Sequence, residues 1–366
     1  EETFTWTIGN PAPDAIDDAA TTGENAVLNG DVTPGTVGQD SDPDGDTLTV
    51  TAVNGLGANV GSDVTGSAGG TFNIAANGSY SFDPGTAFDD LAVGESRVTT
   101  VTYTISDREG GTDVATVTVT VTGVNDAPVS SALTDLTNDD SDIVSVDVSG
   151  SFSDPDTSDT LTFSATGLPP GLSISAAGVI SGTVDHSASV TGPYTVTVRG
   201  TDPSGAFTEE TFTWTIGNPA PDAIDDTGST GENSTLSGDV TPGTVGQDSD
   251  PDGDTLTVTA VNGLGANVGS GVTGSAGGTF TIQSNGGYAF DPGTAFDDLA
   301  VGESRVTTVT YTISDGEGGT DVATVTITVT GVNDAPVSTA LTDLSNDDSD
   351  TISVDVSGSF SDPDSS

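Results

Sequence analysis

Apolar and polar residues alternate along most of this chain. Between residues 115 and 121 every second residue is alanine or valine, and threonine occupies the positions between them. Because successive side chains of a β-strand point to opposite faces of a sheet, this period of two predicts half-buried antiparallel strands with one face in water. The same alternation occurs at 48–52, 101–105, 161–165, 194–198 and 211–216.

Turn residues separate these runs at short intervals. Asn-Gly pairs stand at 77–78 and 285–286, and the chain holds 49 glycines in all. No segment keeps the 3.6-residue period of an amphipathic helix. About seven short strands in each 90 to 115 residues predict an all-β protein of tandem Ig/cadherin-like β-sandwich domains in an extended array.

Self-comparison shows that the chain is repetitive. Residues 1–158 align without a gap with residues 209–366, at an offset of 208, and roughly twenty positions differ. Two kinds of domain, here named A and B, alternate within one unit. We expect the last strand of a truncated B-type domain at 1–9, A1 at 10–124, B1 at 125–217, A2 at 218–332 and the start of a truncated B-type domain at 333–366. We therefore expect the chain to be a window on a longer repetitive protein.

The composition is strongly acidic, with 56 Asp and Glu against four Lys and Arg, for a formal net charge of −52. Such a chain has no basic patch, so nucleic acid and anionic membrane surfaces are excluded as partners. It has no cysteine, which excludes disulfides, and no apolar run long enough for membrane insertion. Acidity of this degree is typical of disorder, but the ordered alternation contradicts that interpretation. Folding should therefore depend on cations that neutralise the carboxylates.

Closely spaced aspartates in one loop of each domain are the strongest chemical signal. In domain A four of them stand at every second position, and domain B has a shorter version. The predicted ligands of this first loop are Asp40, Asp42, Asp44 and Asp46 in A1, Asp248, Asp250, Asp252 and Asp254 in A2, Asp154, Asp156 and Asp159 in B1, and Asp362 and Asp364 in the last segment. Such carboxylates repel one another unless a hard cation binds, and calcium, with six to eight oxygen ligands, suits a flexible loop better than magnesium does. The alternative is a solvated acidic turn.

Sandwich topology places two further groups beside this loop. The turn between the last two strands and the linker from the preceding domain should both lie at the same pole of the domain. They add Asp107 and Glu109 in A1, Asp202 in B1, Asp315 and Glu317 in A2, and the linker residues Asn125, Asp126, Asn218, Asn333 and Asp334. We predict several calcium ions, mainly at the interdomain junctions. Whether Glu24 and Glu232 bind metal or are strand-edge carboxylates stays open, as does whether Asp14, Asp17 and Asp18 bind metal or face water.

Several motifs resemble known families. The linker VNDAP at 124–128 resembles the NDNAP linker of cadherins, and the Asp-x-Asp pairs resemble their calcium motif. Domain A, with DSDPDGDTLTVTAVNG and TYTISDREGGTDVATVTVTVTGVNDAP, resembles VCBS repeats. Domain B, with FSDPDTSDTLTFSATGLPPGLSISAAGVISGT, resembles dystroglycan-type cadherin-like, or Ig-like, domains. The resemblance implies calcium-dependent extender modules of giant bacterial adhesins of the RTX class. The chain departs from the cadherin linker at Asn10 and Asn218, which proline follows, and it lacks the nonapeptide repeats of RTX proteins.

The predicted function is structural. We expect extender repeats of an extracellular or cell-surface adhesin, which serves cell adhesion or a biofilm matrix, with neighbouring repeats of the same chain as partners. A subunit of an extracellular filament or surface layer, in contact with other copies, and a module that binds glycan or protein are the alternatives. No enzyme activity is expected: His186 is the only histidine, and Asp89-Asp90 lack the cleft that a glycosidase needs. Trp6 and Trp214 are expected to pack in cores.

Overall fold

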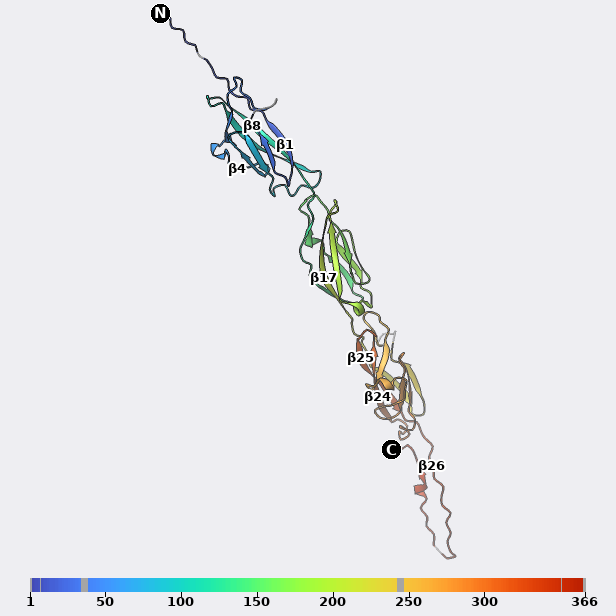
Figure 1. Cartoon of the computed structure of the whole chain (residues 1–366). Coiled ribbons are helices and arrows are strands. Elements are labelled where there is room, and N and C mark those ends of the chain that lie inside the picture. The colour runs from blue at the N-terminus through green and yellow to red at the C-terminus, as the bar shows by residue number, and fades with distance from the viewer. Residues whose placement is uncertain (1, 7, 34–38, 242–246, 350, 365–366) are drawn as a thin grey trace.

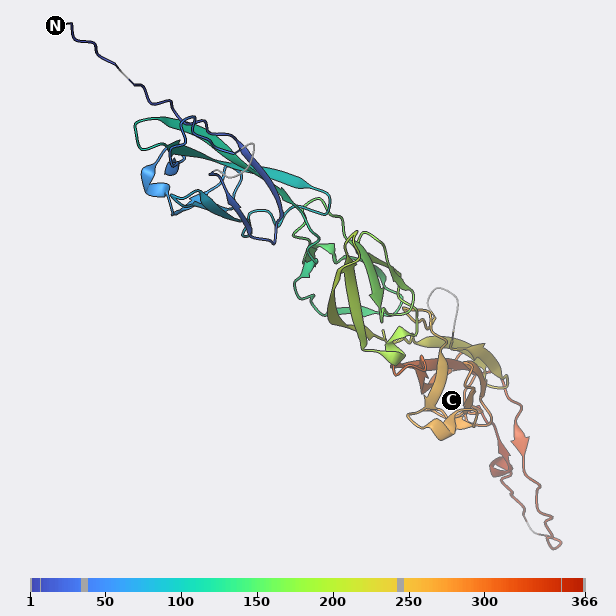
Figure 2. The ribbon, with the colours of Figure 1, turned by 45° about the horizontal axis from the view of Figure 1, so that its top comes forward.

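The prediction of an all-β fold of tandem sandwiches is confirmed. A computed structural model describes residues 2–6, 8–33, 39–241, 247–349 and 351–364. Three sandwich bodies follow one another end to end, and an extended hairpin follows the third (Figure 1). Figure 2, a turned view, shows the same linear order. The described residues contain no α-helix; their helices are short 3₁₀ turns, namely η1 (Gly57–Asn59), η2 (Ser149–Ser151), η3 (Ala188–Thr191), η4 (Gly265–Asn267) and η5 (Ser357–Ser359). Among these residues no helix has the length and apolar character needed to cross a membrane.

Domain A1 consists of two four-stranded sheets. One has the order β1 (Asp18–Gly23), β8 (Thr112–Thr122), β7 (Ser96–Ser106) and β3 (Thr49–Val53). The other has the order β2 (Leu28–Asp31), β6 (Ser79–Asp83), β5 (Thr71–Ile74) and β4 (Asp63–Thr65). Neighbouring strands are antiparallel except β1 and β8, which are parallel.

Domain A2 repeats this architecture with the same strand order. Its sheets are β18 (Asp226–Gly231), β25 (Thr320–Thr330), β24 (Ser304–Ser314) and β20 (Thr257–Val261), and then β19 (Leu236–Asp239), β23 (Gly287–Asp291), β22 (Thr279–Ile282) and β21 (Val272–Thr273). The hairpin beyond it holds β26 (Val337–Ser338) and β27 (Phe360–Ser361).

Domain B1 has a smaller sandwich. Its larger sheet has the order β10 (Leu136–Asp139), β17 (Phe207–Gly217), β16 (Tyr194–Thr201) and β13 (Thr162–Thr166). A three-stranded sheet faces it, with β11 (Ile143–Asp147), β15 (Val179–Thr183) and β14 (Leu172–Ile174), and β9 (Val129–Ser130) pairs with β12 (Phe152–Ser153). The first strand of this four-stranded sheet, β10, is parallel to the last strand of the domain, β17, as β1 is to β8 and β18 is to β25.

Each sandwich has its own core, formed by the apolar positions of the alternating strands. In β8 the residues Ala115, Val117, Val119 and Val121 are buried, whereas the threonines between them face outward and are half exposed. In B1 the indole of Trp214 is fully buried, and its Nε1 donates to Asn138 Oδ1 at 3.1 Å. Trp6 does not follow the prediction: it is 79% exposed, and residues 2–6 and 8 form no strand.

Candidate metal centres

The first loop of domain A gathers carboxylates from alternate residues. Asp42, Asp44 and Asp46 in A1 form a group whose oxygens lie within 4.8 Å of one another, and Asp250, Asp252 and Asp254 in A2 form the same group. In A2 the loop is tightened by Asp250, whose Oδ1 accepts hydrogen bonds from the backbone N–H of Asp252 at 3.1 Å and of Asp254 at 3.2 Å. Proline and glycine allow this turn, and Gly253 adopts a φ of +93°.

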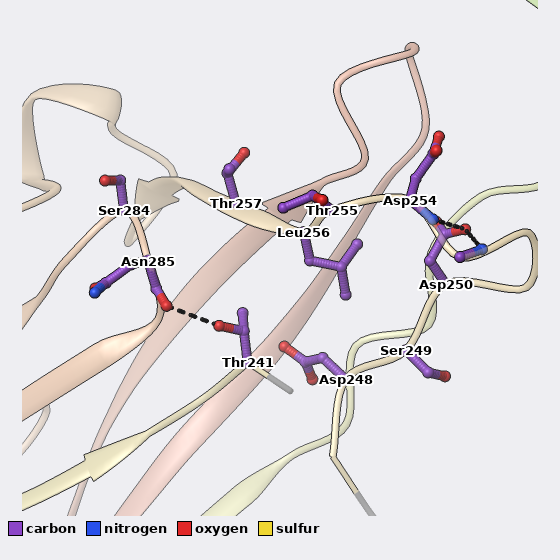
Figure 3. A pocket seen from close by; sticks show the side chains of 11 residues that line it. Thr241, Asp248, Ser249, Asp250, Asp254, Thr255, Leu256, Thr257, Ser284 and Asn285 are labelled. Atoms are coloured by element: carbon purple, nitrogen blue, oxygen red, sulfur yellow. Dashed lines mark hydrogen bonds between the residues drawn. The ribbon is translucent and has the colours of Figure 1, made fainter. Parts of the chain in front are cut away.

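The preceding aspartate of this loop is separated from the group. In Figure 3 the carboxylates of Asp250 and Asp254 lie on one part of the loop, whereas Asp248 lies on another part, in a pocket that Thr241 and Leu256 also line. Asp248 Oδ1 accepts from the Ile224 N–H at 2.7 Å and lies 3.0 Å from the Tyr311 hydroxyl. Asp40 makes the equivalent contacts with Ile16 and Tyr103 in A1. The structure therefore places Asp40 and Asp248 in the domain interior rather than with the three carboxylates that follow them.

Four chain segments meet at the A1–B1 junction. The linker N–H of Asp126 donates to Asp156 Oδ2 at 3.0 Å, and the Asn125 amide donates to Asp202 Oδ2 at 2.9 Å. From A1, Glu24 Oε1 accepts the N–H of Val124 at 2.7 Å. The first loop, the last turn, the linker and the end of β1 thus converge, as the topology predicted for the first three.

Several oxygens at this junction are buried and have no hydrogen-bond partner. They are Glu24 Oε2, Asn125 Oδ1, Asp154 Oδ2 and Asp156 Oδ1. Glu24 and Asp156 are each only 1% exposed. A buried oxygen without a donor is costly, and anionic oxygens beside one another are more costly still. A hard cation would relieve this cost, and a donor set entirely of oxygen fits calcium.

The burial and crowding of carboxylates at the A1–B1 junction also raise the pKa values of several of them. Burial raises the pKa of Glu24, and repulsion from Asp126 and Asp156 adds to the effect. Burial likewise raises the pKa of Asp126 and of Asp154, again with repulsion from Asp156. Asp159 also has a raised pKa, through desolvation and repulsion from Asp156 and Asp202. Without a cation these groups therefore oppose one another's ionisation.

The last segment repeats this arrangement beyond A2. Glu232, Asp334 and Asp364 form a third group of carboxylates within 4.8 Å, and the Asp334 N–H donates to Asp364 Oδ2 at 3.2 Å. Asp364 in turn donates its N–H to Asp362 Oδ1, and the Asn333 amide donates to the Asp334 carbonyl. Glu232, left open in the sequence interpretation, thus belongs to a carboxylate group, and the pKa of its counterpart Glu24 is raised by burial and then by the charges of Asp126 and Asp156.

The B1–A2 junction is built differently. Its unpartnered buried oxygens are Asn218 Oδ1, Asp250 Oδ2, both carboxylate oxygens of Asp252, and Asp254 Oδ2. Burial, then the contact with Asp250 and repulsion from Asp254, raises the pKa of Asp252 to about 7. Domain B1 contributes residues that sequence reasoning missed: His186 Nδ1 lies 2.9 Å from Asp254 Oδ1, and Ser189 Oγ donates to Glu317 Oε2 at 3.1 Å.

Asp140 is a further residue of this junction that the sequence interpretation did not include. It is 3% exposed, accepts the Ser189 N–H at 3.0 Å, and its charge contributes to a raised pKa at Glu317, after burial and repulsion from Asp254. In A1 the counterpart of Glu317, Glu109, is exposed. Contact between B1 and A2 therefore completes the A2 pole.

Three predicted ligands act first as acceptors of N–H groups. Asp107 Oδ1 accepts from the N–H groups of Glu109, Gly110 and Gly111, and its Oδ2 accepts from the Asn10 amide at 2.7 Å. Asp315 and Asp202 have equivalent positions and hold Asn218 and Asn125. These carboxylates orient the linker amide, and at the two interdomain junctions the free Oδ1 of that amide is buried.

The interior carboxylate pair of A2 leads to a testable pH dependence. Tyr311 has one hydroxyl proton, yet its oxygen lies 3.0 Å from both Asp226 Oδ2 and Asp248 Oδ1. Burial, with repulsion from Asp248, raises the pKa of Asp226 to about 6. The folded state therefore keeps a proton that the unfolded chain has lost, so the stability of A2 in chelator should fall as pH rises from about 4 to 6.

Replacing Asp226 by Asn should remove that dependence. At pH 7 the free energy of unfolding of the variant should exceed that of the parent chain by about 1 kcal/mol. The pKa shift at ~1.4 kcal/mol per pKa unit would give more, but Asp226 is half exposed and solvent screens its charge. Thermal unfolding in chelator at pH 5 and pH 7 measures the effect. Asp18→Asn in A1 is the matched variant, and a lower melting temperature for both at pH 7 would contradict the assignment.

The domains match two family models. The bacterial cadherin-like domain matches residues 10–123 and 218–331, and the model described as "Putative Ig domain" matches residues 127–217. Families of this kind are typically non-catalytic. No curated protein matches the chain.

Fragments of cadherins and protocadherins are among the solved structures that this chain resembles. Mouse Cadherin-23 EC22-24 is 16% identical with a TM-score of 0.40, covering 88% of this chain and 99% of that one. Human CDH23 EC21-23 is 16% identical with a TM-score of 0.43, covering 86% and 100%. Protocadherin gammaB7 EC3-6 is 15% identical with a TM-score of 0.42, covering 91% and 77%. The two matches at 10–123 and 218–331 span more than half of the sequence, and the chain therefore belongs to the bacterial cadherin-like domain family, with one Ig domain between its two copies.

Proposed function

We propose that this chain is a stretch of calcium-rigidified extender repeats of a bacterial cell-surface or secreted adhesin. The observation that carries the proposal is the group of buried, unpartnered oxygens at the A1–B1 junction, which Glu24, Asn125, Asp154 and Asp156 supply from both domains and the linker. A calcium ion bound there would join the two domains through its own ligands. The angle between neighbours would then depend on the ion.

Each junction has its own donor set. At A1–B1 the ion would be held by Glu24, Asn125, Asp126, Asp154 and Asp156, with Asp202 orienting Asn125. At B1–A2 the donors would be Asn218 with Asp250, Asp252 and Asp254, and Glu317 stands beside them. Calcium supplies charge neutralisation, and sites of this extracellular type bind at about 10⁻⁴ to 10⁻³ M. We therefore expect stiffening at millimolar calcium.

The family and the repeat support the adhesin part of the proposal. Bacterial cadherin-like and Ig domains in tandem are typical of extracellular adhesion proteins, and A1 and A2 differ at few positions. Near-identity favours a spacer, because a rod depends on uniform length rather than on distinct binding pockets. The VCBS-like motifs favour a giant adhesin of the RTX class, in which the partners of these domains are neighbouring repeats of the same chain. Its surface location follows from that assignment.

Small-angle X-ray scattering of the whole chain tests the proposal. In millimolar calcium we expect the profile of an extended rod, and after chelation that of a flexibly jointed chain with a broader distribution of end-to-end distances. The matched control is magnesium at the same ionic strength, which should not restore the rod. An identical profile in calcium and in chelator would refute the proposal, and micromolar binding to a glycan array would favour a binding module instead.

A further inference from the structure

In all three sandwiches one sheet contains the last strand of the domain, and the first strand of that sheet lies parallel to it. In A1, β1 pairs with β8 over six residues, from Asp18 opposite Val117 to Gly23 opposite Thr122. A2 repeats this pairing between β18 and β25, and in B1 four residues of β10 pair with β17. Figure 1 shows β1 and β8 side by side along the length of their domain. The parallel pair thus runs between the two poles at which neighbours attach.

The direction of the chain decides how tension acts on this pair. In A1 and A2 the chain enters at the upstream end of the first strand of the parallel pair, and in B1 the short β9 precedes that strand. Each domain's last strand continues from its downstream end directly into the linker. Tension along the rod therefore pulls the two parallel strands in opposite directions along their own axes. All hydrogen bonds between them are loaded together, whereas strands pulled apart from one end lose theirs one at a time.

A carboxylate extends the parallel ladder at its upstream end in every domain. Asp17 Oδ1 accepts the Thr116 N–H at 2.8 Å, Asp135 Oδ1 accepts the Thr213 N–H at 2.7 Å, and Asp225 Oδ1 accepts the Thr324 N–H at 2.8 Å. Each aspartate immediately precedes the first strand, and each threonine immediately precedes the residue that pairs with the start of that strand. A and B differ in sequence, so the same added bond in both indicates a shared requirement.

The downstream end of the ladder is extended as well. In A1 the Glu24 N–H donates to the Thr122 carbonyl at 3.0 Å, and Glu24 Oε1 accepts the Val124 N–H at 2.7 Å. Glu232 makes the same two bonds in A2, at 3.0 and 2.7 Å. In B1 the Asp140 N–H donates to the Gly217 carbonyl at 2.9 Å. The parallel ladder is therefore extended beyond both of its ends.

We propose that these parallel strand pairs are the force-bearing elements of the chain, and that Asp17, Asp135 and Asp225 lock their upstream ends. The domains then resist stretching along the rod axis with or without bound calcium. The proposal goes beyond the extender role and rests on it only for the origin of the load. Loss of stiffness on chelation tests the extender role, whereas resistance of each domain to unfolding in chelator tests the force-bearing element.

The absence of cysteine from the sequence makes the first test direct. Cysteines introduced at Gly9 and Gly358, where a side chain meets no other atom, allow optical tweezers to pull the whole chain in shear. Cysteines at Gly9 and the exposed Glu109 instead place both handles at one pole of A1 and peel β1 from β8. In chelator we expect the shear force to be at least twice the peeling force. Equal forces in the two geometries would overturn the proposal.

Removing the carboxylate locks is the second test. In chelator, Asp17→Ala with Asp225→Ala should raise the unfolding rate of both A domains under shear about fivefold, the effect of one net hydrogen bond. B1, which keeps Asp135, is the internal control. Its unfolding releases fewer residues than that of an A domain, and because each released residue adds about 3.5 Å, the gain in chain length identifies it. The peeling force of A1 should change less, and Asp17→Asn with Asp225→Asn should restore most of the resistance. An unchanged shear rate, or an equal acceleration of B1, would refute the role of the locks.

Discussion

Replacing Asp156 by Asn should weaken calcium binding at the A1–B1 junction by about 100-fold, while it stabilises the calcium-free chain. Asp156 is 1% exposed, and its Oδ1 has no partner while its Oδ2 accepts the Asp126 N–H at 3.0 Å. Asparagine keeps an acceptor for that N–H but removes one charge from the ion's ligands. Without calcium the same change relieves repulsion toward Glu24 and Asp154, which should add about 1 kcal/mol to the stability of B1.

The two opposite effects distinguish a metal ligand from an ordinary buried aspartate. Calorimetric titration should lose one class of sites, while the group of Glu232, Asp334 and Asp364 beyond A2 remains as an internal reference. The matched control is Asp63→Asn, which removes one charge from an exposed position of β4. If Asp156→Asn lowered the stability in chelator and left calcium binding unchanged, the junction would not be a calcium site.

The fold was predictable because burial on one face of a sheet imposes a period of two on the sequence. The alternation at Ala115, Val117, Val119 and Val121 contains that information locally, and the buried face of β8 follows it residue by residue. The loop clusters were predictable for a similar reason, since aspartates at every second position of a tight turn have no room to separate. Asp250, Asp252 and Asp254 come together through contacts within five residues of chain.

The rest of the candidate sites depends on contacts that leave no local pattern. His186 reaches Asp254, and the charge of Asp140 acts on Glu317, only because B1 packs against the A2 pole. Asp40 was expected among the ligands because its spacing continues that of Asp42, yet its partner is Tyr103, 63 residues away. The sequence does not distinguish an aspartate that accepts backbone N–H groups from one that binds a cation. Only the residues that surround each aspartate in the fold do.

Replacing Asp315 by Ala should cost A2 about 3 kcal/mol and loosen the B1–A2 junction. Asp315 is 6% exposed; its Oδ1 accepts the N–H groups of Glu317, Gly318 and Gly319 at 2.8 to 3.0 Å, and its Oδ2 accepts the Asn218 amide at 2.8 Å. Alanine leaves all four donors without this acceptor. Part of this loss of stability therefore arises in the turn and part at the linker, and the two parts can be measured separately.

Asp107→Ala in A1 separates the two parts. Asp107 makes the same bonds to its own turn and to Asn10, and it lies away from the B1–A2 junction. Both variants should lower the melting temperature of their own A domain by a similar amount, since the turn is equivalent. Only Asp315→Ala should change the B1–A2 angle, because Asn218, unlike Asn10, lies in the linker between B1 and A2.

Spin labels on the exposed Ser173 of B1 and Ser237 of A2 measure that angle in a chain without other cysteines. In calcium, the distance distribution between the labels should be narrow for the parent chain and for Asp107→Ala, and broad for Asp315→Ala. Asp315→Asn should give an intermediate width, because its single oxygen serves the turn while its amide faces that of Asn218. A narrow distribution in Asp315→Ala would show that the carboxylates of the first loop, with Glu317 and Ser189, hold the junction without the linker amide.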